Sequence, residues 1–260
     1  MIDIRAAAAR YYDMQPIPFE DISFYKAHLP SPQASVLELG CGTGRVLLPL
    51  AEHCGYIHGL DASEAMLASC RAKMEKAGLG LEKVCVQVAD ITAVDLDRKF
   101  DLIIAPYRVF QNLESDESVA GFFETVRKHL APVGVCILNV FHPNRDPDGI
   151  VERSANNRET VTWESPTERG RVVCFESFRR PALRSVDRLV IYPRLRYREH
   201  RGDQLVGEAV LDIAMRVYYP EEFEVLIERH GFRVLDRWGG YAGEVYGQGP
   251  ELVVKLADSG

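Results

Sequence analysis

The chain has 260 residues, of which 47% are hydrophobic and 27% charged, as in ordinary globular proteins. Its net charge of -7 argues against a general nucleic-acid-binding surface, which requires clustered lysine and arginine. No apolar run is long enough to span a bilayer, and the start Met1–Arg5 lacks the basic and apolar regions of a signal peptide. The six cysteines are scattered singly, which predicts reduced thiols in a cytoplasmic protein and no metal site.

The first half of the chain predicts short strands that alternate with helices. Two helices, at 5–13 and 21–29, come before the first strand. Strands are then predicted at 36–39, 56–60, 84–88, 100–105 and 133–140. The helices between them are predicted at 45–53, 64–76 and 119–130. This alternation favours a parallel sheet that is covered by helices on both faces.

After Phe141 the pattern changes to that of antiparallel strands. These are predicted at 160–163, 172–178, 188–197 and 205–218, with a hairpin turn at 201–203 between the last two. Pro220 then begins a helix that continues through Glu228 and ends at Gly231. Strands at 232–238 and 252–256 close the chain. The prediction is therefore an α/β fold with an antiparallel β insertion before the final helix.

A glycine-rich turn, Glu38-Leu39-Gly40-Cys41-Gly42-Thr43-Gly44, joins the strand at 36–39 to the next helix. Glycines at this position let a ligand approach the backbone, and Asp61 at the end of the next strand can bind a ribose diol. A dinucleotide fingerprint would need glycine at position 45, where the chain has Arg45. The G-x-G-x-G spacing suits a nucleoside with an amino-acid tail better than a pyrophosphate. The alternative is that the turn serves only helix–strand packing and Asp61 only caps a helix.

With these residues in place, the sequence resembles the class I methyltransferases that use S-adenosylmethionine. Their first motif, acidic-x-G-x-G-x-G, matches Glu38, Gly40, Gly42 and Gly44. The resemblance is strong over 34–140 and looser over the final helix and strands. It implies a Rossmann-like seven-stranded sheet, mostly parallel with the last strand antiparallel, and helices on both faces. The implied organisation is an N-terminal helical lid (1–33), a cofactor-binding α/β domain (34–140 and 219–260) and a β insertion (141–218) for the acceptor or a subunit contact.

The resemblance also implies S-adenosylmethionine as the cofactor, with no metal. The glycine turn lies against the methionine portion of the cofactor, and Asp61 binds the ribose hydroxyls. The carboxylate of Asp90, after the third strand, meets the adenine amino group. Met66 is implied to lie near the adenine, and Ala105 near the cofactor's amino group. The other neighbouring residues of the implied cofactor site are Cys41, Ala62 and Ile91.

The pair Tyr12-Asp13 resembles a feature of small-molecule N-methyltransferases, including glycine-type and nucleotide-sugar enzymes, and the segment 105–113 resembles bacterial enzymes that methylate small heterocycles. In the glycine-type and nucleotide-sugar enzymes a tyrosine of a mobile N-terminal helix closes over the cofactor and the acceptor. Tyr12 is the matching residue and Tyr25 is a second candidate; the alternative is that both only anchor N-terminal helices. Asn112 stands where nucleotide-sugar enzymes often have histidine, which counts against a sugar amine and against a base at that position.

Methyl transfer from a sulfonium is an in-line displacement, so the enzyme mainly orients the acceptor. A base is needed only where the acceptor must lose a proton. His142, just after the fifth strand, and Tyr107 are the candidate catalytic residues, although His142 can also be a loop histidine. The residues predicted to orient the acceptor, or to be merely solvated, are Arg108, Gln111 and Asn112. The histidines predicted to lie at the surface are His28, His53, His129, His200 and His230, whereas His58 is predicted to be structural.

Arg194, Arg196 and Arg198 share one face of a predicted strand. A charged solvent face is favoured over a binding site for an anionic acceptor. The leading hypothesis is a methyltransferase acting on a nitrogen or oxygen of a small molecule, without nucleic-acid or membrane partners and with a homodimer contact through the β insertion. The alternatives are an RNA or protein methyltransferase, a non-catalytic S-adenosylmethionine-binding protein, and an NAD-dependent enzyme.

Overall fold

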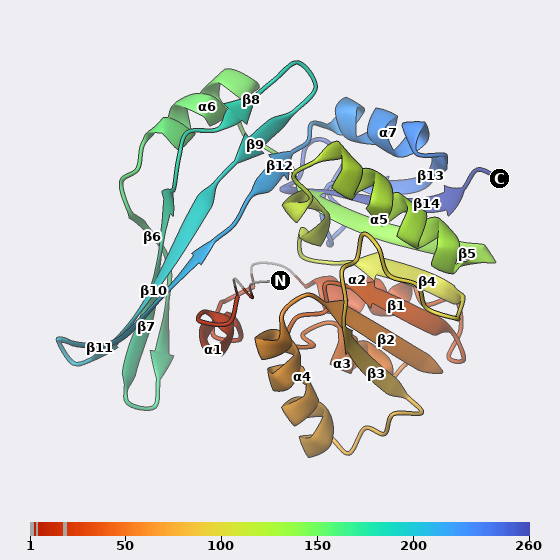
Figure 1. Cartoon of the computed structure of the whole chain (residues 1–260), viewed down its shortest axis with the longest axis horizontal. Helices are drawn as coiled ribbons and strands as arrows, with labels where there is room; N and C mark the ends of the chain where they lie inside the picture. The colour runs from red at the N-terminus through yellow and green to blue at the C-terminus, as the bar shows by residue number, and fades with distance from the viewer. Residues whose placement is uncertain (1–2, 4, 18–19) are drawn as a thin grey trace.

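The computed structural model describes residues 3, 5–17 and 20–260, and its main body is a seven-stranded sheet (Figure 1). The strands are β1 (Ser35–Leu39), β2 (Tyr56–Asp61), β3 (Val84–Val88), β4 (Phe100–Ala105), β5 (Leu130–Phe141), β13 (Phe232–Trp238) and β14 (Glu251–Asp258). Their order is β13-β14-β5-β4-β1-β2-β3, and β14 alone runs antiparallel to its neighbours. The predicted fold class is confirmed.

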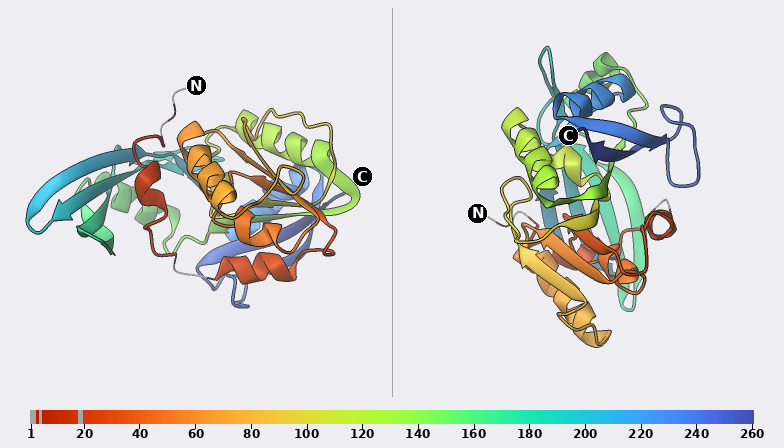
Figure 2. Two further views of the ribbon diagram at one scale, coloured as in Figure 1. Left: turned by 90° about the horizontal axis from the view of Figure 1, so that it is seen from below. Right: turned by 90° about the vertical axis from the view of Figure 1, so that its right-hand side faces the viewer.

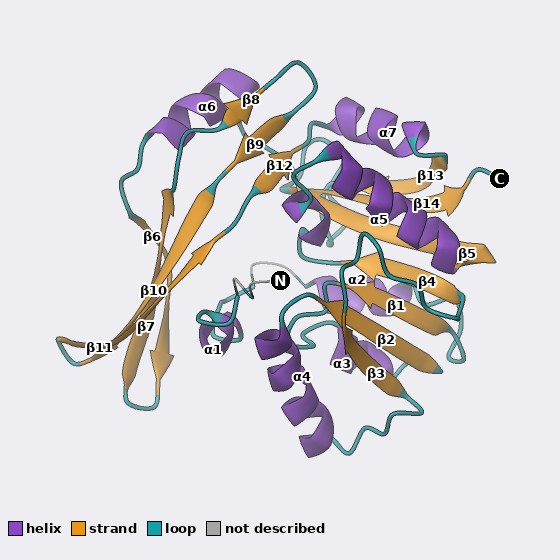
Figure 3. Cartoon of the chain, in the orientation of Figure 1, coloured by secondary structure: helices purple, strands orange, loops and turns teal. Residues whose placement is uncertain are grey.

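Helices cover both faces of this sheet, as Figure 3 shows. On one face lie α2 (Asp21–Ala27), α3 (Leu47–Ala51) and α4 (Glu64–Lys76), and on the other α5 (Asp116–His129) and α7 (Pro220–Arg229). The alternation of strand side chains produces the two cores: Val36 packs toward α3 and α4, whereas Leu37 and Leu39 pack toward α5 and α7. Each fully buried valine or leucine side chain stabilises the folded state by about 1.5–3 kcal/mol.

Helix boundaries follow local capping residues. The helix predicted from residue 119 begins at Asp116, because the Ser115 side chain accepts a hydrogen bond from the Ser118 amide and acidic residues occupy the first turn. The helix predicted at 45–53 is shorter, and so is the one at 5–13, where α1 (Ala9–Tyr12) is a single turn.

The insertion between β5 and α7 forms two small antiparallel sheets, in the orders β11-β10-β7-β6 and β12-β9-β8. Its elements are α6 (Pro147–Ala155), β6 (Thr160–Thr167), β7 (Gly170–Phe178), β8 (Leu183–Arg184), β9 (Leu189–Ile191), β10 (Pro193–Arg201), β11 (Gln204–Asp212) and β12 (Met215–Val217). The predicted strands at 188–197 and 205–218 are each divided between the two sheets. Pro193 marks one division, since proline has no N–H to continue a ladder.

Helix α6 was not expected from the strand-like pattern of the insertion. Its N-terminus nevertheless has the residues that typically begin a helix. The Asp146 side chain accepts a hydrogen bond from the Gly149 amide at 2.8 Å, and Pro147 occupies the first turn. The predicted hairpin turn lies between β10 and β11, where Gly202 has the positive φ that such a turn needs.

The N-terminal segment lies between the main sheet and the long ribbon of the insertion (Figure 2). Tyr11 stacks on Tyr197 of β10, with ring centroids 5.5 Å apart. Asp13 accepts a hydrogen bond from Thr43 in the glycine turn at 2.6 Å and pairs with Lys73 of α4 at 2.7 Å. The segment therefore contacts both parts of the molecule. The predicted lid (1–33) includes residues 1, 2, 4, 18 and 19, which lie outside the described residues, as does part of the start that was predicted to lack a signal peptide. Movement of the lid stays a prediction.

None of the helices in the described part of the chain is both long enough and apolar enough to cross a membrane.

Candidate cofactor and acceptor site

Three backbone positions in the turn after β1 favour glycine over any other residue. The φ angles of Gly40, Gly42 and Gly44 are +76°, +55° and +83°, which residues with a Cβ rarely adopt. Their surroundings differ. A Cβ on Gly40 would lie 2.5 Å from Val109, and one on Gly44 would lie 2.6 Å from the Cys70 sulfur. A Cβ on Gly42 would meet nothing closer than the Met66 methyl at 3.5 Å. Gly44 therefore serves helix packing, whereas Gly42 leaves open space at the wall of a cavity.

That cavity has a volume of about 320 Å³ and is lined by Gly40, Gly42, Asp61 and Met66 on the side of the main sheet. Asp61 ends β2 and is 9% exposed. Its Oδ2 accepts from the Gly42 amide at 2.9 Å and its Oδ1 from the Ser63 amide at 2.8 Å. Each carboxylate oxygen keeps acceptor capacity beyond these bonds, which suits the hydroxyls of a ribose. The helix that follows is capped by Ser63 and not by Asp61.

Glu38 lies beneath the turn and does not line the cavity. Its side chain is 2% exposed, and its Oε2 has no hydrogen-bond partner among the described residues. Burial raises its pKa well above the ordinary value, an effect that the nearby Arg45 opposes. Arg45, which replaces the glycine of a dinucleotide motif, makes two hydrogen bonds of 2.6 Å to the buried Asp21 of α2. It therefore ties the glycine turn to the N-terminal helices.

Five further residues of the implied cofactor site do not line this cavity. Cys41 is buried, and its sulfur packs against Gly59 in the core. Ala105 is buried at the end of β4. Asp90 is exposed, and its Oδ1 accepts from the amide and hydroxyl of Thr92. Direct contact of these residues, and of Ala62 and Ile91, with the cofactor stays a prediction.

The N-terminal segment closes one side of the cavity. Tyr12 lines it and meets the Tyr107 ring edge-on, with centroids 6.4 Å apart. Gln15 donates a hydrogen bond of 2.6 Å to the Tyr107 hydroxyl, and Arg5 also lines the cavity. Neither Gln15 nor Arg5 was predicted. Tyr25 is fully buried in the core beside Phe24, so its candidacy for closing over the ligand was wrong.

The loop after β4 has an unusual backbone. Tyr107 and Arg108 have φ angles of +54° and +65° and are the only non-glycine residues of the described chain with positive φ. Such conformations cost about 1–3 kcal/mol each and occur where surrounding contacts enforce them. Both side chains line the cavity. Burial raises the pKa of the Tyr107 hydroxyl, which Arg108 and Arg45 partly oppose, so the phenol stays protonated.

A buried polar network holds Arg108 in this conformation. Its amide donates to the Asn139 side chain at 2.9 Å, and its guanidinium pairs with Glu251 of β14. Asn139 of β5 donates to the same carboxylate at 2.8 Å. Glu251 is fully buried; burial raises its pKa, an effect that Arg108 and Asn139 oppose. Neither Asn139 nor Glu251 was predicted, although Asn139 interrupts an apolar strand and Glu251 directly precedes one in the sequence.

Gln111 was wrongly predicted to orient the acceptor. It lies in the 3₁₀ turn η1 (Val109–Asn112), is fully buried, and donates to the Arg216 carbonyl at 2.9 Å while accepting from the Phe141 amide at 2.8 Å. It therefore joins three segments of the structure. Asn112, from the same turn, does line the cavity.

His142 does not line the first cavity but a second one of about 370 Å³, which shares Arg108, Glu176, Pro193 and Met215 with it. Its Nδ1 lies 2.9 Å from the Gly249 carbonyl. A carbonyl can only accept, so Nδ1 donates the hydrogen bond in this contact. By contrast, His129 was wrongly placed at the surface: it is buried, with its ring between the Thr125 carbonyl and the Leu96 amide.

The insertion forms the far wall of the first cavity, and this wall is mostly apolar. It consists of Trp163, Cys174, Leu195, Tyr197, Leu211 and Ile213, with Glu176 as its one acidic residue. Because these side chains face the glycine turn across the cavity, a small acceptor held here lies beside the proposed cofactor position.

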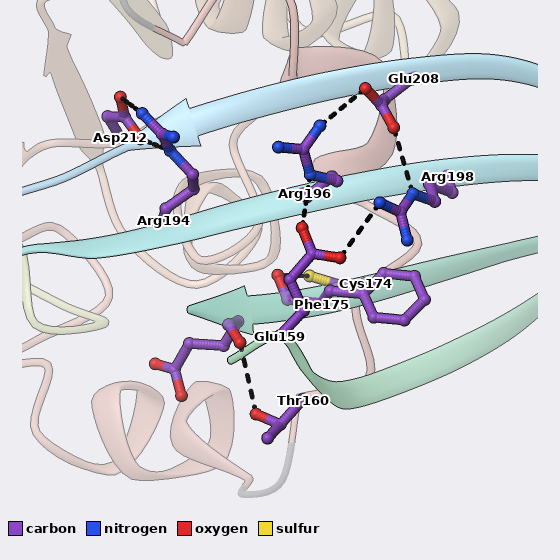
Figure 4. A network of polar contacts seen from close by, with 10 residues as sticks. Glu159, Thr160, Cys174, Phe175, Arg194, Arg196, Arg198, Glu208 and Asp212 are labelled. Carbon is purple, nitrogen blue, oxygen red and sulfur yellow. Dashed lines mark hydrogen bonds and ion pairs between the residues drawn. The ribbon is translucent and has the colours of Figure 1, made fainter. Parts of the chain in front are cut away.

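The three arginines of β10 point away from this wall, since Leu195 and Tyr197 alternate with them. Figure 4 shows that each is paired. Arg194 makes hydrogen bonds of 2.7 and 2.8 Å to Asp212. Arg196 and Arg198 both lie between Glu159 and Glu208, at 2.7–3.1 Å. This face is a neutralised charge network, which favours the solvent-face interpretation over an anionic acceptor site.

No group of three or more histidine, cysteine or carboxylate side chains with metal-binding geometry occurs in the part of the chain that the structure describes.

Comparison with known proteins identifies the family. Residues 36–134 match the model of a methyltransferase domain. The chain is 34% identical over 141 residues to a phosphatidylethanolamine N-methyltransferase of Cereibacter sphaeroides, covering 54% of this chain and 67% of that protein. It is 28% identical to the dTDP-3-amino-3,4,6-trideoxy-alpha-D-glucopyranose N,N-dimethyltransferase of Streptomyces venezuelae, over 51% of this chain and 54% of that one. The chain thus spans about half to two thirds of the length of these relatives.

A solved S-adenosylmethionine-dependent methyltransferase from Clostridium acetobutylicum has the same fold, with a TM-score of 0.75 over 97% of both chains at 17% identity. The chain therefore belongs to the S-adenosylmethionine-dependent methyltransferases. S-adenosylmethionine is its cofactor. The free space beside Gly42 and the Asp61 carboxylate, which the Gly42 amide holds in place by a hydrogen bond, fit this cofactor.

Proposed function

We propose that this protein transfers the methyl group of S-adenosylmethionine to a nitrogen of a small-molecule acceptor. The observation that carries the proposal is the shared cavity: Gly42 and Asp61 line one wall and the apolar face of the insertion lines the other. Its volume of about 320 Å³, together with the adjoining 370 Å³, suits small ligands rather than a macromolecule. The two curated relatives, both named as N-methyltransferases, support nitrogen as the acceptor atom.

When bound, S-adenosylmethionine supplies an electrophilic methyl carbon whose bonding electrons stay on sulfur as the new bond to the acceptor forms. The protein's part is orientation and exclusion of water. Tyr12 and Tyr107 cover the cavity from the N-terminal side, and the protonated Tyr107 hydroxyl can donate to a bound acceptor. Arg108 and Asn112 line the same space. His142 stays a candidate base for an acceptor that reaches the second cavity.

The test is ligand-dependent thermal stability. A ligand that binds only the folded state at 100 times its Kd stabilises that state by about 2.7 kcal/mol, which raises Tm by about 5–11 °C for a protein of this size. We expect this rise with S-adenosylmethionine or its demethylated product, and none with NAD. Asp61→Asn, which removes one acceptor of the ribose contact, should abolish most of the rise. Asp203→Asn, an exposed change in the β10–β11 turn, is the matched control. An equal response to NAD, or no response to either ligand, would reject the proposal.

Two further proposals concern the whole molecule. All six cysteines are unpaired, which supports a cytoplasmic location. A homodimer formed through the insertion is tested by the molar mass in solution, because deletion of the β10–β11 turn should then convert a dimer to a monomer.

A further inference from the structure

Glu176 occupies an unexpected place on β7. Side chains at alternate positions of a strand share one face, which puts Val172, Cys174, Glu176 and Phe178 together. Val172 and Cys174 are fully buried in the apolar cluster beneath α1. A carboxylate on such a face is costly unless a cation or hydrogen-bond donor compensates it. Glu176 also lines both cavities, so it lies at their junction.

The charge of Glu176 is only partly compensated within the protein. Its Oε2 accepts a hydrogen bond of 3.0 Å from Arg153 of α6, whose side chain is 49% exposed. Among the residues that the structure describes, Oε1 has no hydrogen-bond donor. Arg108, the other charged residue at the junction, is already paired with the buried Glu251. Glu176 therefore presents an open acceptor oxygen to the junction of the cavities.

Apolar side chains line both cavities beside Glu176, together with the guanidinium group of Arg108 in both and that of Arg153 in the second. Trp163 and Leu195 line the first cavity beside it, and Phe178, Ile191 and Met215 line the second. A ligand that fills both spaces therefore needs an apolar body and one cationic or hydrogen-bond-donating group between its ends. An ammonium group meets this need, since a charge-assisted hydrogen bond to a partly desolvated carboxylate is about twice as strong as a neutral one.

We infer that Glu176 binds the amino group of the acceptor, so that the substrate class is an amine with an apolar body. This inference rests on the proposed function and names the substrate class of the same site.

The test measures binding in the whole 260-residue chain without cofactor. Three probes share a phenyl body: phenethylamine, 2-phenylethanol and 3-phenylpropanoate, whose binding at neutral pH is followed by ligand-observed NMR titration. The wild type should bind the amine at least about tenfold more tightly than the alcohol, as a charge-assisted bond predicts. Glu176→Gln keeps the shape of the side chain and should remove this preference. Glu168→Gln, in the exposed β6–β7 turn, should keep it.

A second variant separates ligand binding from a structural ion pair. Arg153→Gln frees Oε2 from its only charged partner and should tighten amine binding severalfold while leaving the alcohol unchanged. A merely structural role for Glu176 predicts no such gain. The inference is overturned if Glu176→Gln keeps the amine preference, if 3-phenylpropanoate is the preferred probe, or if Arg153→Gln fails to tighten amine binding. The S-adenosylmethionine-dependent rise in Tm of the wild type tests the proposed function separately, so the two failures are distinguishable.

Discussion

Alanine at Gly42 and alanine at Gly44 make the same chemical change two residues apart, yet the structure predicts opposite consequences. Both residues have positive φ, so each substitution strains the backbone. At Gly42 the new methyl group enters the cavity beside Met66, 3.5 Å from its methyl carbon. At Gly44 it meets the Cys70 sulfur at 2.6 Å and Leu48 at 3.0 Å, where α4 and α3 pack on the turn.

The magnitudes separate the two variants. A left-handed conformation costs an alanine about 1–2 kcal/mol. Overpacking in a core costs about 1–3 kcal/mol more, and this applies only to Gly44. With about 2–4 °C of Tm per kcal/mol for a protein of this size, Gly42→Ala should lose about 2–8 °C and Gly44→Ala about 4–20 °C. Because the Gly42 methyl occupies ligand space, its S-adenosylmethionine affinity should fall at least about tenfold, or about 1.4 kcal/mol.

The assay combines calorimetric unfolding without ligand and titration calorimetry with S-adenosylmethionine, performed on both variants and the wild type. Gly44→Ala, where it remains folded at the titration temperature, should bind the cofactor within about threefold of the wild type, a difference below 1 kcal/mol. The reasoning is refuted if Gly42→Ala binds normally, because the space beside Gly42 is then not where the ligand lies. It is refuted equally if Gly44→Ala loses no more stability than Gly42→Ala, because backbone strain is common to both variants and overpacking should add about 1–3 kcal/mol at Gly44 alone.

Two further predictions concern buried polar side chains. Burial, with a contribution from Arg98, lowers the pKa of His58 in the folded protein to about 4. The unfolded chain therefore binds more protons than the folded one between pH 6.5 and 4. The free energy of unfolding should fall by up to about 3 kcal/mol as the pH drops through this window. Urea unfolding of His58→Leu at each pH should lack that component, and an unchanged pH profile would contradict it. Gln111→Leu leaves the Phe141 amide and the Arg216 carbonyl without their partner and should cost about 2–5 kcal/mol in the same assay, with S-adenosylmethionine affinity retained. Loss of cofactor binding without loss of stability would show instead that Gln111 contacts the ligand.

The features that sequence predicted well are those set by short-range spacing. The turn from Glu38 to Gly44 and the carboxylate of Asp61 are separated by one helix and one parallel strand, so their meeting follows from the βαβ arrangement alone. The same local logic applies to the alternation of strands and helices that produced the sheet. Local capping would also have revealed α6, since Asp146-Pro147 is a helix start that the strand-like surroundings obscured.

Residues brought together from distant segments could not be predicted in this way. Arg108 meets Glu251 because β14 inserts beside β5, a pairing over 143 positions that no local pattern encodes. Glu176 faces the cavity only because the insertion folds over the main sheet. Gln111 was misassigned because its orientation depends on two consecutive left-handed residues, Tyr107 and Arg108, which sequence propensity disfavours. The apolar surroundings of His129 likewise arise from the packing of α5 on β5, with Leu96 above it.

The place of Glu251 on β14 has a consequence for how the molecule matures during synthesis. β14 is the final strand in the chain, and it slots between β13 and β5. The glycine turn and Asp61 emerge from the ribosome well before Glu251, the carboxylate that holds Arg108. A nascent chain can therefore build the nucleoside-facing wall while Arg108 still lacks its counter-ion. The acceptor-facing side is finished only when β14 docks between β13 and β5, so it is completed after the nucleoside-facing wall.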